Sequence, residues 1–544
     1  MKKSRFLTLA LALALLMSVM TLPAAAEEPV TLTIGVQRSS VVENWDTNLQ
    51  TLKIEEVCGV NLEFVEFPSS SNECMQKVDL MVVAGGDELP DVLMFNVPLP
   101  TSVISKYGKA GIFVDLTDLY DGVHDKNFTE QSTKCALGKE GILKYITSPD
   151  GRIYGMPYVV DAMDNEYANN RMLIYEPWLK ALDLEMPTTI DEFVEVLRAF
   201  KTQDPNGNGE ANDMDEYIVT EKYCNHETLG QLTIRKLGNV LTDYQDGQFI
   251  YTQDNYYQNV DGKIEYVANT EKWKEGLLFI RSLVDEELLS PLTFTMDFNQ
   301  FKAIMTQDTV VVGVQGANSS SYMPADMERR IEYIIAAPLE GPDGTRQCTV
   351  KPQLPSTKMY ITRNCQNVEK AFEVGDFLCS QLMSVWDRYG IEGVDWRYAV
   401  EGEHGAFEAA GIPTVFATLT SKWGTMQNTW WGHVGPQMLM NDFVMGVVCG
   451  PLDHFVPLGR SISPLMECAN TENGVWGLIF TDEEQKIVDE YQNVLNDYVM
   501  ESVGRFVTRD LSLEDDWDNY VASIDAMGLE EYLGAIQSAF DRTL

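Results

Sequence analysis

The sequence predicts an α/β protein built on mostly parallel sheets. Strand and helix patterns alternate through the first part of the chain, the alternation resets after Gly151, and 544 residues are enough for two or three domains. The first strands are expected at 31–36, 61–67 and 89–95, and the helices between them at 48–57 and 73–84. Such an order forms βαβ crossovers, whose parallel strands are covered on both faces and bind ligands beyond their carboxyl ends.

The later part of the chain continues the mixed pattern. After Gly151 a turn and a strand are expected, then a helix over 173–182 and a helix over 190–200 capped by Thr188 or Thr189. The helix expected over 270–286 carries apolar residues at spacings of three and four, which indicates a core-facing stripe. The remaining expected elements are a buried strand at 309–314 and helices at 368–387, 483–500 and 529–540.

The N-terminus is typical of a secretory signal peptide. Three cationic residues precede an apolar stretch over 6–19, and Ala24 to Ala26 offer small residues for cleavage near Ala26. We therefore expect residues 1–26 to be removed and the mature chain to contain no transmembrane segment. No cysteine follows the apolar stretch until Cys58, so the usual acceptor of a lipid anchor is absent, and both anchoring by a partner and release remain open.

The composition is strongly acidic. The chain has 40 Lys and Arg against 82 Asp and Glu, a formal net charge of −42. Nucleic acid and anionic membrane surfaces are therefore excluded as expected partners, whereas neutral ligands and calcium are compatible with this charge.

A calcium-binding loop is expected directly after the helix at 190–200. Oxygen-bearing residues occupy positions one, three and five of an EF-hand-like loop, and Gly209 supplies the sharp turn at position six. The expected ligands are Asp204, Asn206, Asn208, Glu210 through its carbonyl, Asp215 and Glu216. The alternative is a solvated turn, since Asp, Asn and Gly also gather in ordinary turns.

Six stretches in the same order resemble the extracellular solute-binding proteins of ABC sugar importers. The resemblance is to the long-chain branch that includes oligosaccharide-binding, alginate-binding and lipoprotein members. It is carried by LMVVAGGDELPDVLMF (80–95), YGMPY (154–158), RMLIYEPWLKALDLEMPTTIDEFVEVLRAF (171–200), PLEGPDGTR (338–346), YGIEGVDW (389–396) and the closing stretch 512–542. In that family the acidic pair of the calcium loop follows the glycine directly, whereas Asp215 and Glu216 come three residues later here.

The resemblance implies a periplasmic-binding-protein-like fold, with two lobes joined by hinge strands. The first lobe is expected to comprise 27–160 and 310–397, and the second 161–309 and 398–544 with the C-terminal helices. It further implies a monomer that encloses a carbohydrate between the lobes and delivers it to the permease subunits of an ABC transporter. The calcium ion would be structural and would lie in the second lobe, away from the cleft.

Sugars bind by stacking on aromatic rings and by hydrogen bonds to their hydroxyls, and both kinds of group are available. The segment 421–436 combines three Trp residues with a His and is expected on a second-lobe loop. The candidate ligand-binding residues are Trp423, Trp430, Trp431 and His433 from this segment, Trp45 and Asp46 on the first lobe, Tyr158 by the hinge, and Asn318. Adjacent Trp residues point to opposite sides, so at most one of Trp430 and Trp431 is expected to face ligand; the alternative is that both are core.

Two other functional classes compete with a binding protein for import. A secreted glycoside hydrolase would use two carboxylates, but the chain has no H-E-x-x-H, G-x-S-x-G or P-loop motif, and its five His lack metal-ligand spacing. We therefore expect no enzyme. A freely secreted sugar scavenger or a ligand-binding sensor protein would keep the fold and change only its use.

Overall fold

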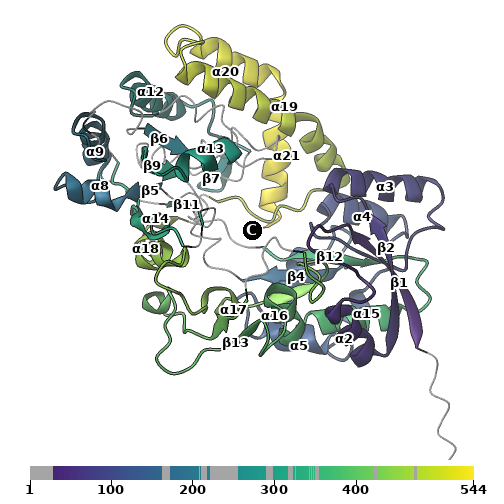
Figure 1. The fold of residues 1–544 in the computed structure, drawn as a ribbon. Helices are drawn as coiled ribbons and strands as arrows, with labels where there is room; N and C mark the ends of the chain where they lie inside the picture. Colours follow the sequence, from purple (N-terminus) through teal and green to yellow (C-terminus); the bar gives the residue numbers. More distant parts are fainter. Residues whose placement is uncertain are drawn as a thin grey trace, which may run out of the picture.

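The structure is a computed structural model of the chain. It describes residues 29–161, 172–207, 209, 217–220, 255–289, 298–316, 323–324, 326–341, 344, 346, 348–349, 354–420, 426–470 and 474–543. Its main strands form two separate sheets, which lie in different halves of the molecule in Figure 1.

The first sheet has six strands in the order β15-β4-β12-β3-β1-β2. Their bounds are Val30–Gln37 (β1), Val60–Phe67 (β2), Val92–Met94 (β3), Met156–Val160 (β4), Ser356–Ile361 (β12) and Gln437–Leu439 (β15). β1 runs parallel to β2 and β3, β15 runs parallel to β4, and β12 runs antiparallel to its neighbours β3 and β4. The parallel core expected from the alternation of strands and helices is therefore present here.

Helices cover both faces of this sheet. The helices of this half are Leu49–Cys58 (α2), Ser71–Val83 (α3), Thr101–Lys109 (α4), Lys126–Ser132 (α5), Gly138–Ile146 (α6), Val368–Leu378 (α15) and Gln381–Tyr389 (α16). One buried cluster joins Ile34 and Met359 to Ile54 of α2 and Phe372 of α15. A second cluster joins side chains of β3 and β12 to α3 and α4. The sheet is thus the middle layer of three.

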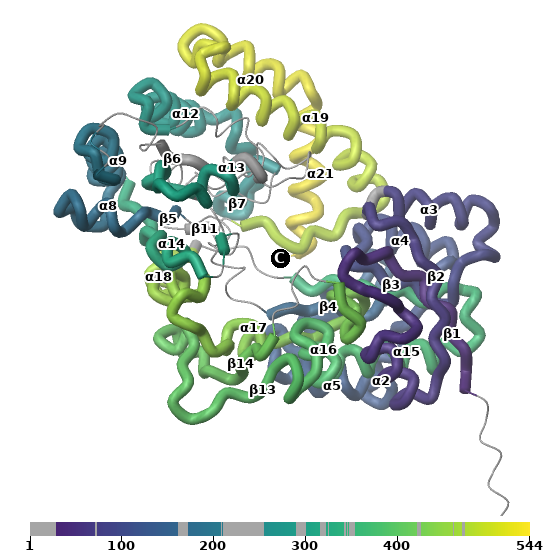
Figure 2. The backbone as a smooth tube through the Cα atoms, viewed as in Figure 1, coloured from purple at the N-terminus to yellow at the C-terminus, as the bar shows by residue number. Residues whose placement is uncertain are grey.

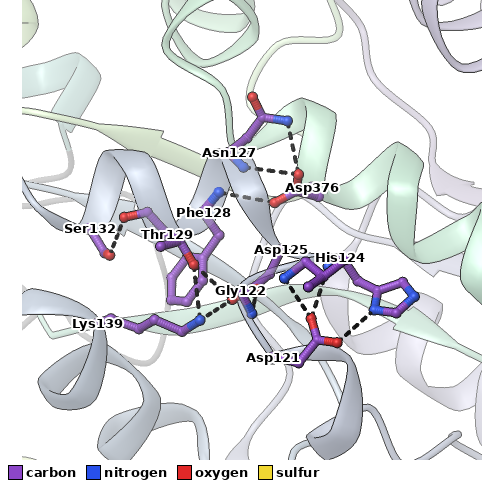
Figure 3. Close-up of polar contacts among 11 residues, drawn as sticks. Asp121, Gly122, His124, Asp125, Asn127, Phe128, Thr129, Ser132, Lys139 and Asp376 are labelled. Carbon is purple, nitrogen blue, oxygen red and sulfur yellow. Dashed lines mark hydrogen bonds and ion pairs between the residues drawn. The ribbon is translucent and has the colours of Figure 1, made fainter.

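A polar network fixes α5 against α15, as Figure 3 shows. The carboxylate of Asp376 in α15 accepts hydrogen bonds from the N–H groups of Asn127 and Phe128, at 3.0 and 2.9 Å, in the first turn of α5. Asp125 is fully buried just before α5, and its carboxylate lies 2.5 Å from the ammonium of Lys139 in α6. The Asp376 carboxylate thus satisfies N–H groups that a helix start otherwise leaves unpaired, whereas the Asp125 carboxylate accepts from the N–H of Gly122, before the helix.

The second sheet has four strands in the order β10-β5-β9-β6. Their bounds are Met172–Tyr175 (β5), Tyr217–Thr220 (β6), Val312–Gly316 (β9) and Tyr333–Ile335 (β10). β5 runs antiparallel to both neighbours and β6 runs parallel to β9, so this sheet is mixed rather than mostly parallel. Short two-stranded sheets are formed by Tyr257–Val260 (β7) with Lys263–Tyr266 (β8), Cys348–Thr349 (β11) with Ala469–Asn470 (β16), and Trp396–Tyr398 (β13) with Phe416–Thr418 (β14).

The remaining helices lie mainly around one large buried cluster, which also includes Val160 of β4, Leu439 of β15 and Val385 of α16. They are Glu176–Ala181 (α8), Ile190–Thr202 (α9), Glu271–Asp285 (α12), Phe298–Met305 (α13), Arg329–Glu332 (α14), Asp442–Met445 (α17), Phe455–Glu467 (α18), Asp482–Val507 (α19), Trp517–Ala526 (α20) and Leu529–Asp541 (α21). The last three pack together, and in Figures 1 and 2 α21 runs from the top of the molecule toward its middle, where the C-terminus lies. In the described part of the chain, no helix has both the length and the apolar character that crossing a bilayer requires.

The start of α9 agrees with its predicted cap. The hydroxyl of Thr189 accepts a hydrogen bond from the N–H of Glu192, and the Glu192 carboxylate accepts from the N–H of Thr189 in return. This reciprocal pair satisfies two donors at the helix start and fixes where the following loop begins.

The strand pairings correct two of the predicted lobe boundaries. Residues 310–397 were expected in the first lobe, but β9 and β10 pair with β5 in the second sheet. Residues 398–544 were expected in the second lobe, but β15 pairs with β4 in the first sheet. The apolar pattern of a strand shows that it is buried, but not which strand lies beside it.

Candidate ligand-binding site

The carboxyl edge of the first sheet is where the candidate site lies. β1 and β3 end here, and the N–H of Phe95, directly after β3, donates to the carbonyl of Lys358 in β12 at 3.2 Å. Lys358 is therefore at the same edge as the loop that follows β1. Ligands of open α/β sheets bind beyond this edge.

Two loops far apart in the sequence are joined at this edge. Gln427 pairs with residues after β1: its carbonyl accepts from the N–H of Glu43, and its N–H donates to the carbonyl of Val41, both at 2.9 Å. The side chain of Asn428 accepts from the N–H of Asn44 and donates to the Thr47 hydroxyl. Figure 2 shows this green segment against the purple N-terminal part. The segment expected on a second-lobe loop is thus attached to the first lobe.

The described Trp residues of the site are buried. Trp45, Trp430 and Trp431 are 6%, 3% and 0% exposed. Trp431 packs edge-on against Trp45 and Phe64, with ring centroids 6.1 and 5.7 Å apart, and its indole N–H donates to the Thr51 hydroxyl at 2.9 Å. The burial of both members of the adjacent pair agrees with the alternative that both are core. These rings hold the two loops together, because apolar packing within the lobe covers them.

Tyr158 and His433 come together with a lysine that the sequence analysis missed. The Lys358 ammonium lies 3.5 Å from the centre of the Tyr158 ring and donates a hydrogen bond to the His433 carbonyl at 3.2 Å. The His433 ring stands edge-on to Trp430, with centroids 5.5 Å apart. Asp387 of α16 also belongs to this group of residues, with its Oδ2 3.9 Å from Nδ1 of His433. We call Tyr158, Lys358, Asp387 and His433 the wall cluster.

Burial controls the electrostatics of the wall cluster. It raises the pKa of Asp387 to about 7, an effect opposed by the nearby Lys358 ammonium. It lowers the pKa of Lys358 to about 8, against the attraction of Asp387. It also lowers the pKa of His433 to about 3, helped by the positive charges of Arg388 and Lys358. At neutral pH the imidazole is neutral, and a cation lies over the tyrosine ring.

A sequence signal for the missed lysine does exist. Lys358 is the one charged residue in STKMYI, a six-residue run that forms β12 in the middle of the sheet and was not predicted as a strand. It is only 4% exposed. A single Lys inside an otherwise uncharged strand indicates a buried charge with a specific partner.

The other predicted ligand-binding residues are not part of this cluster. Asp46 is exposed on the loop after β1. Trp423 and Asn318 lie outside the described residues.

The described part of the predicted calcium loop is a tight turn that follows α9. The N–H of Gly209 donates to Oδ2 of Asp204 at 2.9 Å, which closes the turn, and Gly209 has a φ of 89° as the expected sharp turn requires. Asp204 and Asn206 are partly buried beside it. The other four expected ligands, Asn208, Glu210, Asp215 and Glu216, lie outside the described residues.

The family of the chain is shown by comparison with known proteins. Residues 55–381, more than half of the chain, match the family described as bacterial extracellular solute-binding protein. The chain belongs to this family. The predicted family and the two-lobe α/β fold class are therefore confirmed.

Relatives of this solute-binding protein cover nearly all of it. The fructooligosaccharide ABC transporter substrate-binding protein FusA of Streptococcus pneumoniae is 24% identical over 511 residues, or 90% of this chain and 86% of the relative. The structure of FusA in complex with kestose superposes with a TM-score of 0.68 at 22% identity, covering 94% of this chain and 99% of FusA. FusA has also been solved as an EF-hand mutant.

Two further solved structures share the fold. An HMO-binding, ABC-transporter-associated solute-binding protein from Bifidobacterium longum infantis has a TM-score of 0.74 at 17% identity, covering 94% of this chain and 99% of the other. Alginate-binding protein AlgQ2, solved without calcium ion, has a TM-score of 0.62 at 20% identity, covering 95% and 98%.

Proposed function

We propose that this protein captures an oligosaccharide between its two lobes and delivers it to an ABC importer. The main support for this proposal is the wall cluster at the carboxyl edge of the first sheet. There the partly exposed residue Tyr158 places its aromatic ring over the Lys358 ammonium. Aromatic rings with a few fixed polar groups are what sugar recognition needs. FusA and AlgQ2, named for binding fructooligosaccharide and alginate, support the same ligand class.

Capture requires that the ligand contacts both lobes. A ligand that touches one lobe has the same affinity for the open and closed forms and therefore cannot drive closure. The first lobe of the proposal consists of the strands of the first sheet and their helices, and the second lobe of the second sheet with α19–α21. The protein acts as an exported monomer, directed out of the cell by residues 1–26, and its partners are the permease subunits.

Sugar binding is tested by a thermal-shift panel followed by calorimetric titration. The panel contains kestose, an alginate oligosaccharide, maltose and an N-glycan fragment. We expect at least one sugar to raise the melting temperature and to bind without being cleaved. If none binds at millimolar concentration, or if one is hydrolysed, carbohydrate capture for import is wrong.

Replacement of Tyr158 tests whether the sugar binds at the wall cluster. We expect Tyr158→Ala to weaken the affinity for the sugar at least about fivefold, since an aromatic anchor at a binding site contributes more than about 1 kcal/mol. Titration of the same sugar measures this loss. The control is Tyr398→Ala, because Tyr398 is half exposed on β13, outside the wall cluster. Equal affinities of the two variants would place the sugar elsewhere.

A structural calcium ion belongs to the same proposal. Asp204 and Asn206 would supply side-chain oxygens to it, and the ion would fasten the loop to the end of α9. Extracellular loops of this kind bind calcium with a Kd of about 10⁻⁴ to 10⁻³ M, so 2 mM calcium would stabilise the fold by about 0.6–1.8 kcal/mol.

Chelation tests the calcium site. We expect EDTA to lower the melting temperature by about 1–3 °C relative to 2 mM calcium. Asp204→Ala should abolish this difference, whereas Glu185→Ala, which removes an exposed carboxylate outside the loop, should preserve it. Identical melting curves of the unmodified protein with calcium and with EDTA would contradict the site.

A further inference from the structure

The carboxyl group of Asp387 is buried beneath the segment 430–436. Its residue is only 4% exposed, and its Oδ1 has no hydrogen-bond donor within the described part of the chain. The backbone N–H of His433, the side chain of Gln50 and the backbone N–H of Trp431 favour the charged form of the carboxylate, and Gln50 itself accepts a hydrogen bond from the N–H of Trp431 at 2.8 Å. The charge of the Asp387 side chain on α16 is therefore coupled to the backbone of the segment 430–436.

The segment itself is held in a strained conformation. His433 has a φ of 68°, which is uncommon for a residue with a side chain, and it lies between Gly432 and Gly435, which also have positive φ. The Lys358 ammonium holds the carbonyl of His433, and the imidazole of His433 faces Asp387. Such strain persists only while the surrounding contacts impose it. A change in those contacts will therefore change the conformation of the segment 430–436.

We propose that Asp387 is a proton switch for the wall of the binding site: uptake of one proton by its carboxyl locks the segment 430–436 against α16, and loss of that proton loosens the segment and admits water. Asp387 and Lys358 are positioning residues in this scheme. They act on ligand through the segment that carries Trp430 and His433. The proposal rests on the proposed function for the statement that this surface binds ligand, but the conformational change itself is one of the ligand-free protein and is measured without any sugar.

The direction of the switch follows from proton linkage. Burial raises the pKa of Asp387 from its ordinary value of 3.8 to about 7, so the packed form binds the proton more tightly than a hydrated form does. Lowering the pH from 7.5 to 5.5 therefore stabilises the packed form. Above about pH 7 the Asp387 carboxylate is ionised while still buried. Opening of the segment 430–436 then becomes more favourable, because it lets water hydrate this charge.

Other titratable groups around Asp387 change their charge less than Asp387 does in this pH range. Lys358 of β12, with a pKa of about 8, stays mainly cationic, and Tyr158 of β4 is neutral because burial raises its pKa to about 12. His433 is neutral because its lowered pKa of about 3 lies below this pH range. Arg388, the neighbour on α16, stays positive. Asp387 is thus the group of this cluster whose charge changes most between pH 5.5 and 7.5.

Amide hydrogen exchange of peptides covering 430–436 tests the switch without any ligand. Protection factors, corrected for the intrinsic rates, are measured at pH 5.5 and 7.5. We expect protection to be about tenfold higher at pH 5.5. Asp387→Asn, which keeps the shape and cannot ionise, should be protected at both values with no pH difference. Equal protection of the unmodified protein at the two values, or an unchanged pH difference in Asp387→Asn, would overturn the proposal.

Two further variants separate the switch from a general effect on folding. Asp376→Asn removes another carboxylate that is 4% exposed and has a raised pKa, but it belongs to the α5 network, so the pH difference at 430–436 should persist. Lys358→Met removes the charge that lowers the pKa of Asp387, so the midpoint of the transition should move to higher pH. A midpoint that stays in place, or moves to lower pH, would contradict the assignment even if Asp387→Asn failed to fold.

Discussion

Lys139→Met is expected to destabilise the protein by about 3–5 kcal/mol, the usual cost of leaving one partner of a buried ion pair uncompensated. The Asp125 side chain has no exposed surface, and the Lys139 ammonium lies 2.5 Å from its carboxylate (Figure 3). Gly122 and Thr129 also donate to this carboxylate, at 2.6 and 3.1 Å, but neither supplies a positive charge. Chemical denaturation measures the loss as a lower transition midpoint.

Two variants make this result specific. Lys126→Met removes an exposed lysine from the start of α5 and should change the free energy of unfolding by less than about 0.5 kcal/mol. The double variant Asp125→Asn/Lys139→Met should recover a large part of the loss, since no buried charge is then left unpaired. A single Lys139→Met variant as stable as the parent would mean that water reaches Asp125.

Trp431→Ala is expected to cost about 3–5 kcal/mol, because it opens a cavity the size of an indole in a closed aromatic cluster. Trp431 has no exposed surface, packs on Trp45 and Phe64, and donates its indole N–H to Thr51. The loss also frees the two loops from one another, so both stability and sugar affinity should fall together. Denaturation and titration on the same preparation measure the two effects.

The controls distinguish a structural Trp from one that stacks on ligand. Trp431→Phe keeps most of the packing and should cost clearly less than Trp431→Ala. Met426→Ala lies in the same segment but is 68% exposed, and should be near neutral in stability. If Trp431→Ala retained its stability and lost only affinity, the indole would contact ligand and its burial here would not describe the bound form.

Local patterns predicted most elements, and failed where a competing local signal was overlooked. The helix expected over 173–182 is the strand β5 followed by the short helix α8, because the apolar run MLIY has no helical period and Pro177 is suited to a helix start. The helix expected over 368–387 is the pair α15 and α16, because the Ser380 hydroxyl caps a new helix start by accepting from the N–H of Met383.

Only part of the candidate site was predicted, because local patterns identify residue types but not their distant partners. Tyr158 and His433 were named from their residue types and their neighbours, and the structure brings them together. Lys358 and Asp387 were not, because each belongs to an element whose pattern is that of buried core. A buried charge is recognised as part of a site only when its partner from a distant segment is known.

The sequence by itself determined the family, the α/β class, the cap of α9 and the spacing of the calcium loop, since each depends on residues close together in the chain. Only the tertiary structure decided that β9 and β10 join the second sheet, that the segment 426–436 belongs to the first lobe, and that Trp45 and Trp431 are core rather than binding surface. The physical reason is that the hydrophobic effect is not directional, so an apolar pattern does not specify which distant residues will cover it. A buried Trp or strand shows how much surface is removed from water, but the surface that covers it is supplied by residues hundreds of positions away.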